Sequence, residues 1–222
     1  MGDAAHGIRR SHRVVAHDMR QHNRVRLGVW QIKTAAQRVA QLVMQAHLRC
    51  AQPRAAHTRC RNGIGRTYQI PRPFTGMTVF ENMLAAATHS TGKSERACDG
   101  LCRDVLNETG MFAKRDVLAS ELRLLDRKRL ELARALATQP KLVLLDEIGG
   151  GLTEHEVHAL VDEIRRLRGR GITLIWIEHI VHALVSVVDR IVAINFGETL
   201  IEGKPQDVLA SKALQEIYLG VE

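Results

Sequence analysis

The chain has 222 residues, of which 45% are hydrophobic and 25% charged, and its formal net charge is +8. These values are typical of a globular protein with one large domain or two small ones. No apolar run approaches the roughly 18–20 residues that a membrane-spanning helix needs, so we expect no transmembrane span. The four cysteines form no CxxC pair, which argues against the common cysteine-based zinc motifs.

The basic excess lies at the start of the chain. Residues 1–60 contain eleven Lys and Arg but only two acids, so the remaining residues are almost neutral. We expect residues 1–60 to be an aberrant basic segment, disordered or partly helical. Apolar residues recur at helical spacing between Ala35 and Ala46, and nothing before them alternates like a strand. With one aromatic residue, Trp30, and no binding motif, this segment predicts no nucleic-acid partner.

From residue 61 onward the chain has regular start and stop signals. Thr78 and Glu81 have the spacing of a capping box, which predicts a helix from Thr78. The patterns predict, in chain order, helices over 78–87, 94–106 and 126–137, a strand over 142–145, a helix over 154–168, a strand over 172–177, a helix over 180–188, and strands over 190–194 and 199–201. Alternation of helices and buried strands predicts an α/β layer with a parallel sheet.

The strongest chemical signal is the apolar run 142–145 that ends in Asp146 and Glu147. A carboxylate at the end of a buried strand is placed to coordinate Mg²⁺ on a nucleotide. A second carboxylate beside it can orient an attacking water. Two solvated acids at a strand end are the plain structural alternative.

The segments around this strand occur in a characteristic order. The first segment is Gly63-Ile-Gly-Arg-Thr-Tyr-Gln69, and the segment 130–141 follows it. After the two acids comes Gly149-Gly-Gly-Leu-Thr153, and the next expected strand ends in Glu178-His179. This set resembles the nucleotide-binding domain of ABC transporters, from about residue 63 to the C-terminus. The resemblance implies a partial P-loop NTPase fold of the ABC ATPase type. Residues 61–222 would form an incomplete ATPase domain, with an α-helical subdomain at about 77–120.

The resemblance also implies a role for individual residues. Asp146 and Gln69 would bind Mg²⁺, and Glu147 and His179 would be catalytic, acting on the attacking water and on the γ-phosphate. Gly151 falls in the loop that follows the two acids in this family and would contact the nucleotide. ATP and Mg²⁺ are the cofactors that follow from these matches.

Two segments suggest a subfamily. Gly65 to Phe74 and Gly76 to Asn82 resemble the ATP-binding subunits of branched-chain amino-acid importers, and importers of urea and short amides share much of this pattern. The implied function is to couple ATP hydrolysis to solute uptake. The implied partners are membrane permease subunits and a second ATPase subunit, at the cytoplasmic face of the inner membrane.

The chain departs from the family pattern at the signature motif. The segment 122–126 stands where the family has Leu-Ser-Gly-Gly-Gln, whose backbone N–H groups approach a phosphate closely. Arg123 and Asp126 would be its nucleotide-facing residues here, whereas Leu125 adds a side chain at the point of approach.

A larger departure concerns the phosphate-binding loop, GxxxxGK[ST]. Only three glycines precede Gly63, and they are too scattered to form this loop. Gly92-Lys93-Ser94 lacks the first glycine, and we interpret it as a polar loop between helices. Loss of about four charge-assisted hydrogen bonds, each worth roughly 1.5–3 kcal/mol, would weaken ATP binding by a factor of about 10⁴ or more.

Two alternatives follow from these departures. The chain could be a non-catalytic partner of an intact ATPase or permease. It could also be a non-functional gene fragment, because the Arg, His, Ala and Gln of residues 1–60 resemble GC-rich coding sequence read in a wrong frame.

Overall fold

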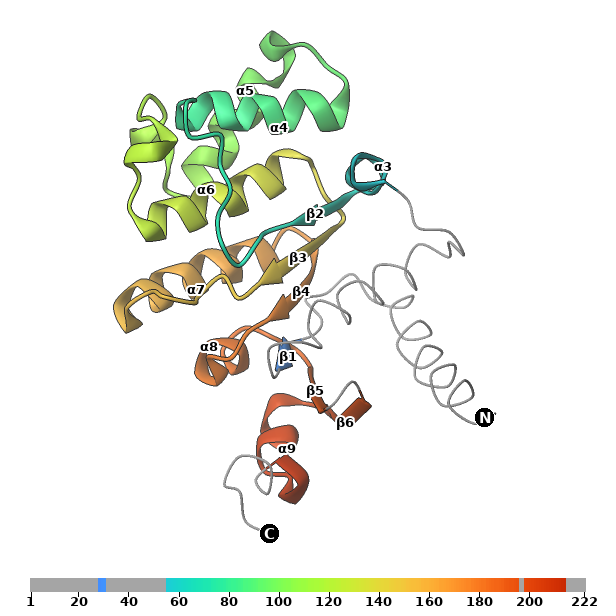
Figure 1. Ribbon diagram of the computed structural model, residues 1–222. Coiled ribbons are helices and arrows are strands. Elements are labelled where there is room, and N and C mark those ends of the chain that lie inside the picture. The colour runs from blue at the N-terminus through green and yellow to red at the C-terminus, as the bar shows by residue number, and fades with distance from the viewer. Residues whose placement is uncertain (1–27, 31–54, 196–197, 215–222) are drawn as a thin grey trace, which may run out of the picture.

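The computed structural model describes residues 28–30, 55–195 and 198–214. Their framework is a six-stranded sheet in the order β2-β3-β4-β1-β5-β6 (Figure 1). The strands are β1 (Gly28–Trp30), β2 (Ile64–Arg66), β3 (Leu142–Asp146), β4 (Thr173–Ile177), β5 (Ile191–Asn195) and β6 (Glu198–Gly203). All neighbours pair in parallel except β5 and β6, which are antiparallel. The expected α/β fold with a parallel sheet is confirmed.

The central strand β1 was not predicted. It pairs with β4 through Gly28 opposite Trp176, and with β5 through Gly28 opposite Ile191. A strand of three residues is too short to show the alternation on which sequence analysis relies. The sheet therefore contains a piece of the segment 1–60. The helix expected over 35–46 and the last residues of the chain lie outside the described residues.

Helix α7 (Glu154–Arg168) packs along β3 and β4 (Figure 1), and its bounds are those predicted. Its start is fixed by Thr153, whose hydroxyl accepts the Glu156 N–H while the Glu156 carboxylate accepts the Thr153 N–H. Its buried residues recur at helical spacing: Val157, Leu160, Val161, Ile164 and Leu167. The apolar face of α7 thus joins the main core.

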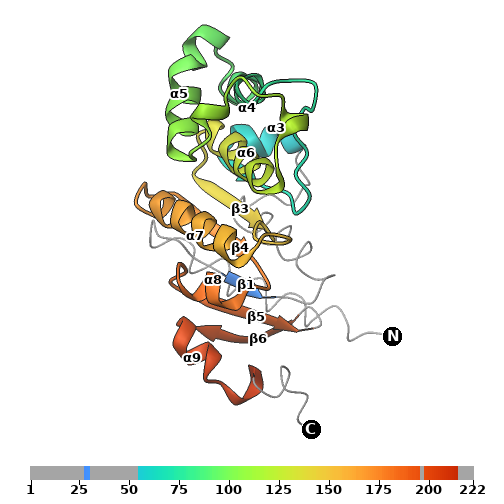
Figure 2. The ribbon, with the colours of Figure 1, turned by 90° about the vertical axis from the view of Figure 1, so that its left-hand side faces the viewer.

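The other helices are α3 (Ala56–Arg61), α4 (Val79–Thr91), α5 (Glu95–Glu108), α6 (Leu124–Ala137), α8 (Val181–Val185) and α9 (Pro205–Leu209), with single 3₁₀ turns at Phe112–Lys114 and Ala119–Glu121. Helices α4, α5 and α6 gather at the β2 end of the sheet, and α9 lies at the β6 end (Figure 2). Fully buried Met83, Leu106 and Leu130 join α4, α5 and α6 in one core. No helix within the described ranges has both the length and the apolar character needed to cross a membrane.

The Gly92-Lys93-Ser94 segment is the loop between α4 and α5. Gly92 ends α4 in the left-handed conformation, with φ of 70°, and its N–H donates to the carbonyl of Thr88. This is a common glycine helix end. The interpretation of the segment as an inter-helix loop is confirmed.

The predicted capping box at the start of α4 is present and can be tested. Thr78 Oγ1 accepts the Glu81 N–H at 3.2 Å, and Glu81 Oε2 accepts the Thr78 N–H at 2.7 Å. The bond from the Thr78 N–H lowers the pKa of Glu81, and so does a second bond that the Thr78 hydroxyl donates to the same carboxylate oxygen at 2.9 Å. Thr78→Ala should reduce the free energy of unfolding in urea by about 1 kcal/mol, because one helix-start N–H loses its acceptor. Thr75→Ala, in the exposed loop before α4, is the control. Equal losses in both variants would contradict a capping role.

Candidate functional site

The functional residues predicted from the sequence follow three adjacent parallel strands. Gln69 comes three residues after β2, Glu147 directly follows β3, and His179 comes two residues after β4. Because β2, β3 and β4 are parallel neighbours, their carboxyl ends share one edge of the sheet. This edge is where open α/β sheets bind their ligands.

Three of these side chains meet at that edge. Gln69 Nε2 donates to Glu147 Oε2 at 2.7 Å, and His179 Nδ1 lies 3.8 Å from the same oxygen. The His179 side chain is about half exposed, whereas that of Glu147 is 18% exposed. An amide, a carboxylate and an accessible imidazole thus surround one point at the surface, where a water molecule or a phosphate can be reached by all three.

Asp146 ends β3 beside this group. Its Oδ2 accepts a hydrogen bond from Arg66 Nη2 at 3.0 Å, and its N–H donates to Thr67 Oγ1 at 3.2 Å. Within the described parts of the chain, Asp146 Oδ1 and Gln69 Oε1 accept no hydrogen bond. Carboxylate and amide oxygens are ligands that Mg²⁺ prefers, so these two residues fit that ion by their chemistry. Arg66 competes with a metal for one of the two Asp146 oxygens.

The backbone of Glu147 lies in the left-handed region, with φ of 43°. Its N–H donates to the carbonyl of Ile177 at 2.8 Å, and its carbonyl accepts a bond from Lys128 Nζ at 3.2 Å. Lys128 Nζ also donates to the carbonyl of Gln69 at 3.2 Å. A non-glycine residue in this region is strained, and such strain is typical of functional sites.

The role of Lys128 was missed in the sequence analysis. It lies on α6, is 2% exposed, and has no carboxylate within ion-pair distance in the described chain. Burial lowers its pKa, while the negative charges of Glu178 and Glu147 act in the opposite direction. The sequence contained a pattern that indicates burial of Lys128. It stands four residues before Leu132 and seven before Ala135, on the buried face of its helix.

Glu178 was part of the quoted Glu178-His179 motif, but no role was predicted for it. Its buried carboxylate accepts the Gly149 N–H at 2.8 Å and the His179 N–H at 3.2 Å. It therefore ties the loop after β3 to the residue that carries the imidazole. A Cβ at position 149 would lie 2.4 Å from Glu178 Oε1, so any other residue there would displace the Glu178 carboxylate. Burial raises the pKa of Glu178, and the two backbone hydrogen bonds partly offset this effect.

The remaining predicted site residues lie around the start of α6. Gly151 has a φ of 77°, and a Cβ there would meet Leu124 at 3.2 Å. Arg123 is exposed at the N-cap of α6. The Asp126 carboxylate pairs with Lys114 and lies 4.0 Å from Arg129. It forms no ion pair with the described residues that meet at the sheet edge. Nucleotide contacts of Gly151, Arg123 and Asp126 therefore stay predictions.

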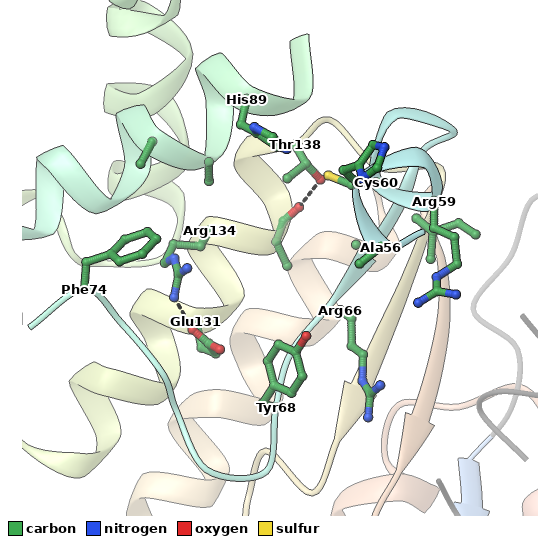
Figure 3. Close-up of a pocket in the computed structure, with 16 residues that line it drawn as sticks. Ala56, Arg59, Cys60, Arg66, Tyr68, Phe74, His89, Glu131, Arg134 and Thr138 are labelled. Atoms are coloured by element: carbon green, nitrogen blue, oxygen red, sulfur yellow. Dashed lines mark hydrogen bonds and ion pairs between the residues drawn. The ribbon is translucent and has the colours of Figure 1, made fainter. Parts of the chain in front are cut away.

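A cavity of about 610 Å³ lies elsewhere, between α3, β2, α4 and α6 (Figure 3). Its wall includes Arg134, whose guanidinium lies 5.1 Å from the centre of the Phe74 ring and donates to Glu131 at 2.8 Å. None of the four residues Gln69, Asp146, Glu147 and His179 lines it. The cavity adjoins the candidate site through Arg66, which lines it and donates to Asp146.

The position of a phosphate-binding loop can also be located. In this fold the loop would follow the central strand β1, where residues 31–54 lie outside the described residues. The sequence of residues 31–54 contains no glycine. A backbone that approaches a phosphate closely needs glycine at several positions, so this segment does not match the motif.

The raised pKa of Glu178 predicts a pH effect. The folded protein keeps this proton to higher pH than the unfolded chain does. The stability contribution of Glu178 is therefore complete below the ordinary glutamate pKa and is lost as pH rises through the raised value. We expect Glu178→Gln to remove this part of the decline in unfolding free energy, measured in urea between pH 4 and pH 8.

The exposed Glu121→Gln variant is the control for this experiment. Its unfolding free energy should follow that of the wild type at every pH. If Glu178→Gln also follows the wild type, then burial does not perturb this carboxyl group.

Comparisons with known proteins agree with this geometry. A family model described as ABC transporter matches residues 17–149. The lipopolysaccharide export ATP-binding protein LptB of Acidithiobacillus ferridurans is 32% identical over 168 residues, which cover 74% of this chain and 68% of that protein. The branched-chain amino acid transport ATP-binding protein BraF of Pseudomonas aeruginosa is 33% identical, with 74% and 70% covered.

Solved structures show the same fold. A nucleotide-free ATP-binding cassette from an ABC transporter superposes with a TM-score of 0.75, at 23% identity, covering 90% of this chain and 89% of that one. The ADP conformation of MJ1267, another such cassette, gives the same values. The family match begins well before residue 60 and spans more than half of the chain. The chain belongs to the ABC transporter family.

Proposed function

We propose that the chain is the ATP-binding subunit of an ABC importer for branched-chain amino acids, or for related amides or urea, and couples ATP hydrolysis to solute uptake. The observation that carries this proposal is the meeting of Gln69, Glu147 and His179 beside Asp146 at the carboxyl edge of the sheet. These residue types in this order suit hydrolysis of a nucleotide phosphate.

Each residue has a chemical task in this proposal. Glu147 accepts a hydrogen bond from the attacking water and polarises it, because its carboxylate is aimed at the shared point. His179 donates a hydrogen bond to the γ-phosphate, and its exposed imidazole is accessible for this. Asp146 and Gln69 would hold Mg²⁺, which supplies charge neutralisation on the phosphates. Lys128 and Glu178 position the backbones of these residues.

The choice of an importer rests on sequence more than on overall similarity. LptB and BraF are almost equally identical to this chain, at 32% and 33%, although their names describe export and import. The segments 65–74 and 76–82 favour the branched-chain amino-acid type. We propose membrane permease subunits and a second ATPase subunit as partners, and the cytoplasmic face of the inner membrane as the location.

A second candidate function is a non-catalytic partner of an intact ATPase. Two observations favour it: the Arg66 guanidinium occupies one oxygen of Asp146, and residues 31–54 contain no glycine. In this case the chain would support the fold of a complex and not hydrolyse ATP. Under the first proposal, the same features reduce ATP affinity without abolishing turnover.

Hydrolysis of ATP by the purified full chain with Mg²⁺ separates the two functions. We expect slow turnover that half-saturates in the millimolar range or above, because phosphate contacts of roughly 6 kcal/mol are missing. Glu147→Gln should lower the rate by about 100-fold or more, since the variant cannot polarise the water. Glu95→Gln, exposed at the start of α5 and outside the candidate site, should keep the wild-type rate. A rate in the wild type that is no higher than the rate in Glu147→Gln would favour the non-catalytic partner.

The transported solute can be tested through the genes beside this one. An importer of amino acids or amides requires permeases and a soluble solute-binding protein, so we expect genes for both as neighbours. Binding of leucine, valine, urea or short amides to the purified solute-binding protein would then identify the solute. Neighbouring genes for an export system would contradict the importer proposal and leave the ATPase proposal intact.

A further inference from the structure

Three side chains of the types that ligate metal ions cluster on the surface. Glu154 and His158 are one turn apart in α7, so their side chains lie on the same side of the helix. His182 reaches them from α8. Each offers one ligand atom, and these atoms lie within 4.8 Å of one another. The two imidazole ring centres are 6.0 Å apart.

The cluster can close around an ion without losing other contacts. All three residues are exposed. In the chain as described, no hydrogen bond or ion pair engages the Glu154 carboxylate or either imidazole. Tetrahedral zinc with ligands at about 2.0–2.1 Å needs ligand atoms about 3.3 Å apart. Rotation of exposed side chains can supply the movement of about 1.5 Å that this requires, because staggered rotamers interconvert freely at the surface.

The ligand types determine the class of ion. Two imidazole nitrogens with one carboxylate oxygen suit zinc and other divalent transition metals, whereas Mg²⁺ and Ca²⁺ prefer oxygen ligands alone. Three protein ligands leave a fourth position open to water. We propose that Glu154, His158 and His182 form a binding site for a divalent transition-metal ion of the zinc class.

The position of this site gives it a structural consequence. His182 is three residues after His179, and Glu154 directly follows Thr153, which ends the loop containing Gly151. A metal bound to both helices joins α8 to the first turn of α7. It therefore restrains the two segments that flank the candidate catalytic residues. The metal site itself does not depend on whether the chain hydrolyses ATP.

Zinc titration of the full chain by calorimetry tests the proposal. We expect one zinc ion to bind at a site whose affinity falls by at least about tenfold in His158→Ala and in His182→Ala, since loss of a ligand exceeds the effect of losing a supporting residue. Glu154→Gln should weaken binding as well. His155→Ala is the matched control, because His155 is exposed on the same helix and lies outside the cluster.

The chain has eleven histidines in total, including the two of this site. Two further measurements distinguish the site from the remaining histidines. Co²⁺ should give visible absorption bands in the wild type and in His155→Ala, and these bands should be lost in His158→Ala and His182→Ala. Zinc should raise the melting temperature of the wild type, reversibly with EDTA, because it binds only the folded state. The proposal would be overturned if His158→Ala and His182→Ala both kept the wild-type zinc affinity and the Co²⁺ bands. Circular dichroism must show in the same experiment that both variants are folded.

Discussion

The candidate site depends on how the backbone of Glu147 is held in its left-handed turn. Its N–H is bonded to Ile177 of the neighbouring strand, and its carbonyl is bonded to the ammonium of Lys128. The same ammonium donates to the carbonyl of Gln69, so one buried ammonium holds the backbones of two of the three residues whose side chains meet at the sheet edge. Without the bond from Lys128, the exposed Gln69 would be held beside Glu147 only by the hydrogen bond between their two side chains.

This arrangement places two buried ionisable groups close to the site, and burying the charged form of each group is unfavourable in free energy. Burial opposes the charge on both Lys128 and Glu178, and each lies in the electrostatic field of the other. Their opposite signs reduce the cost of burying either one. Both form hydrogen bonds with backbone groups, and Glu178 Oε2 also lies 3.4 Å from His179 Nδ1. These contacts hold the backbones of Gln69, Glu147 and His179 in place.

Sequence patterns predicted the elements whose residues repeat at a clear period. Helix α7, strands β3 and β4, and the capping boxes follow from local rules, and the parallel order then brings Gln69, Glu147 and His179 to one edge. Strand β1 could not be predicted, because three residues show no period and its pairing with β4 joins segments about 150 positions apart. Lys128 was overlooked for a different reason: a lysine is normally exposed, and only tertiary contacts reveal that two carbonyls need its ammonium.

The ion pair between Arg66 and Asp146 is the feature on which the two candidate functions differ most. The bond of Arg66 to Asp146 neutralises a carboxylate at a position where a metal ion would otherwise do so, and its stacking near Tyr68 holds the guanidinium in place. The Arg66 side chain is 28% exposed and that of Asp146 is 14% exposed, so the ion pair is largely shielded from water, and separating it leaves the Asp146 carboxylate without its partner. Under the proposed function, a magnesium–nucleotide complex would have to displace this partly buried guanidinium from Asp146. The non-catalytic alternative needs no such displacement, so the Arg66–Asp146 ion pair bears directly on the choice between the two candidate functions.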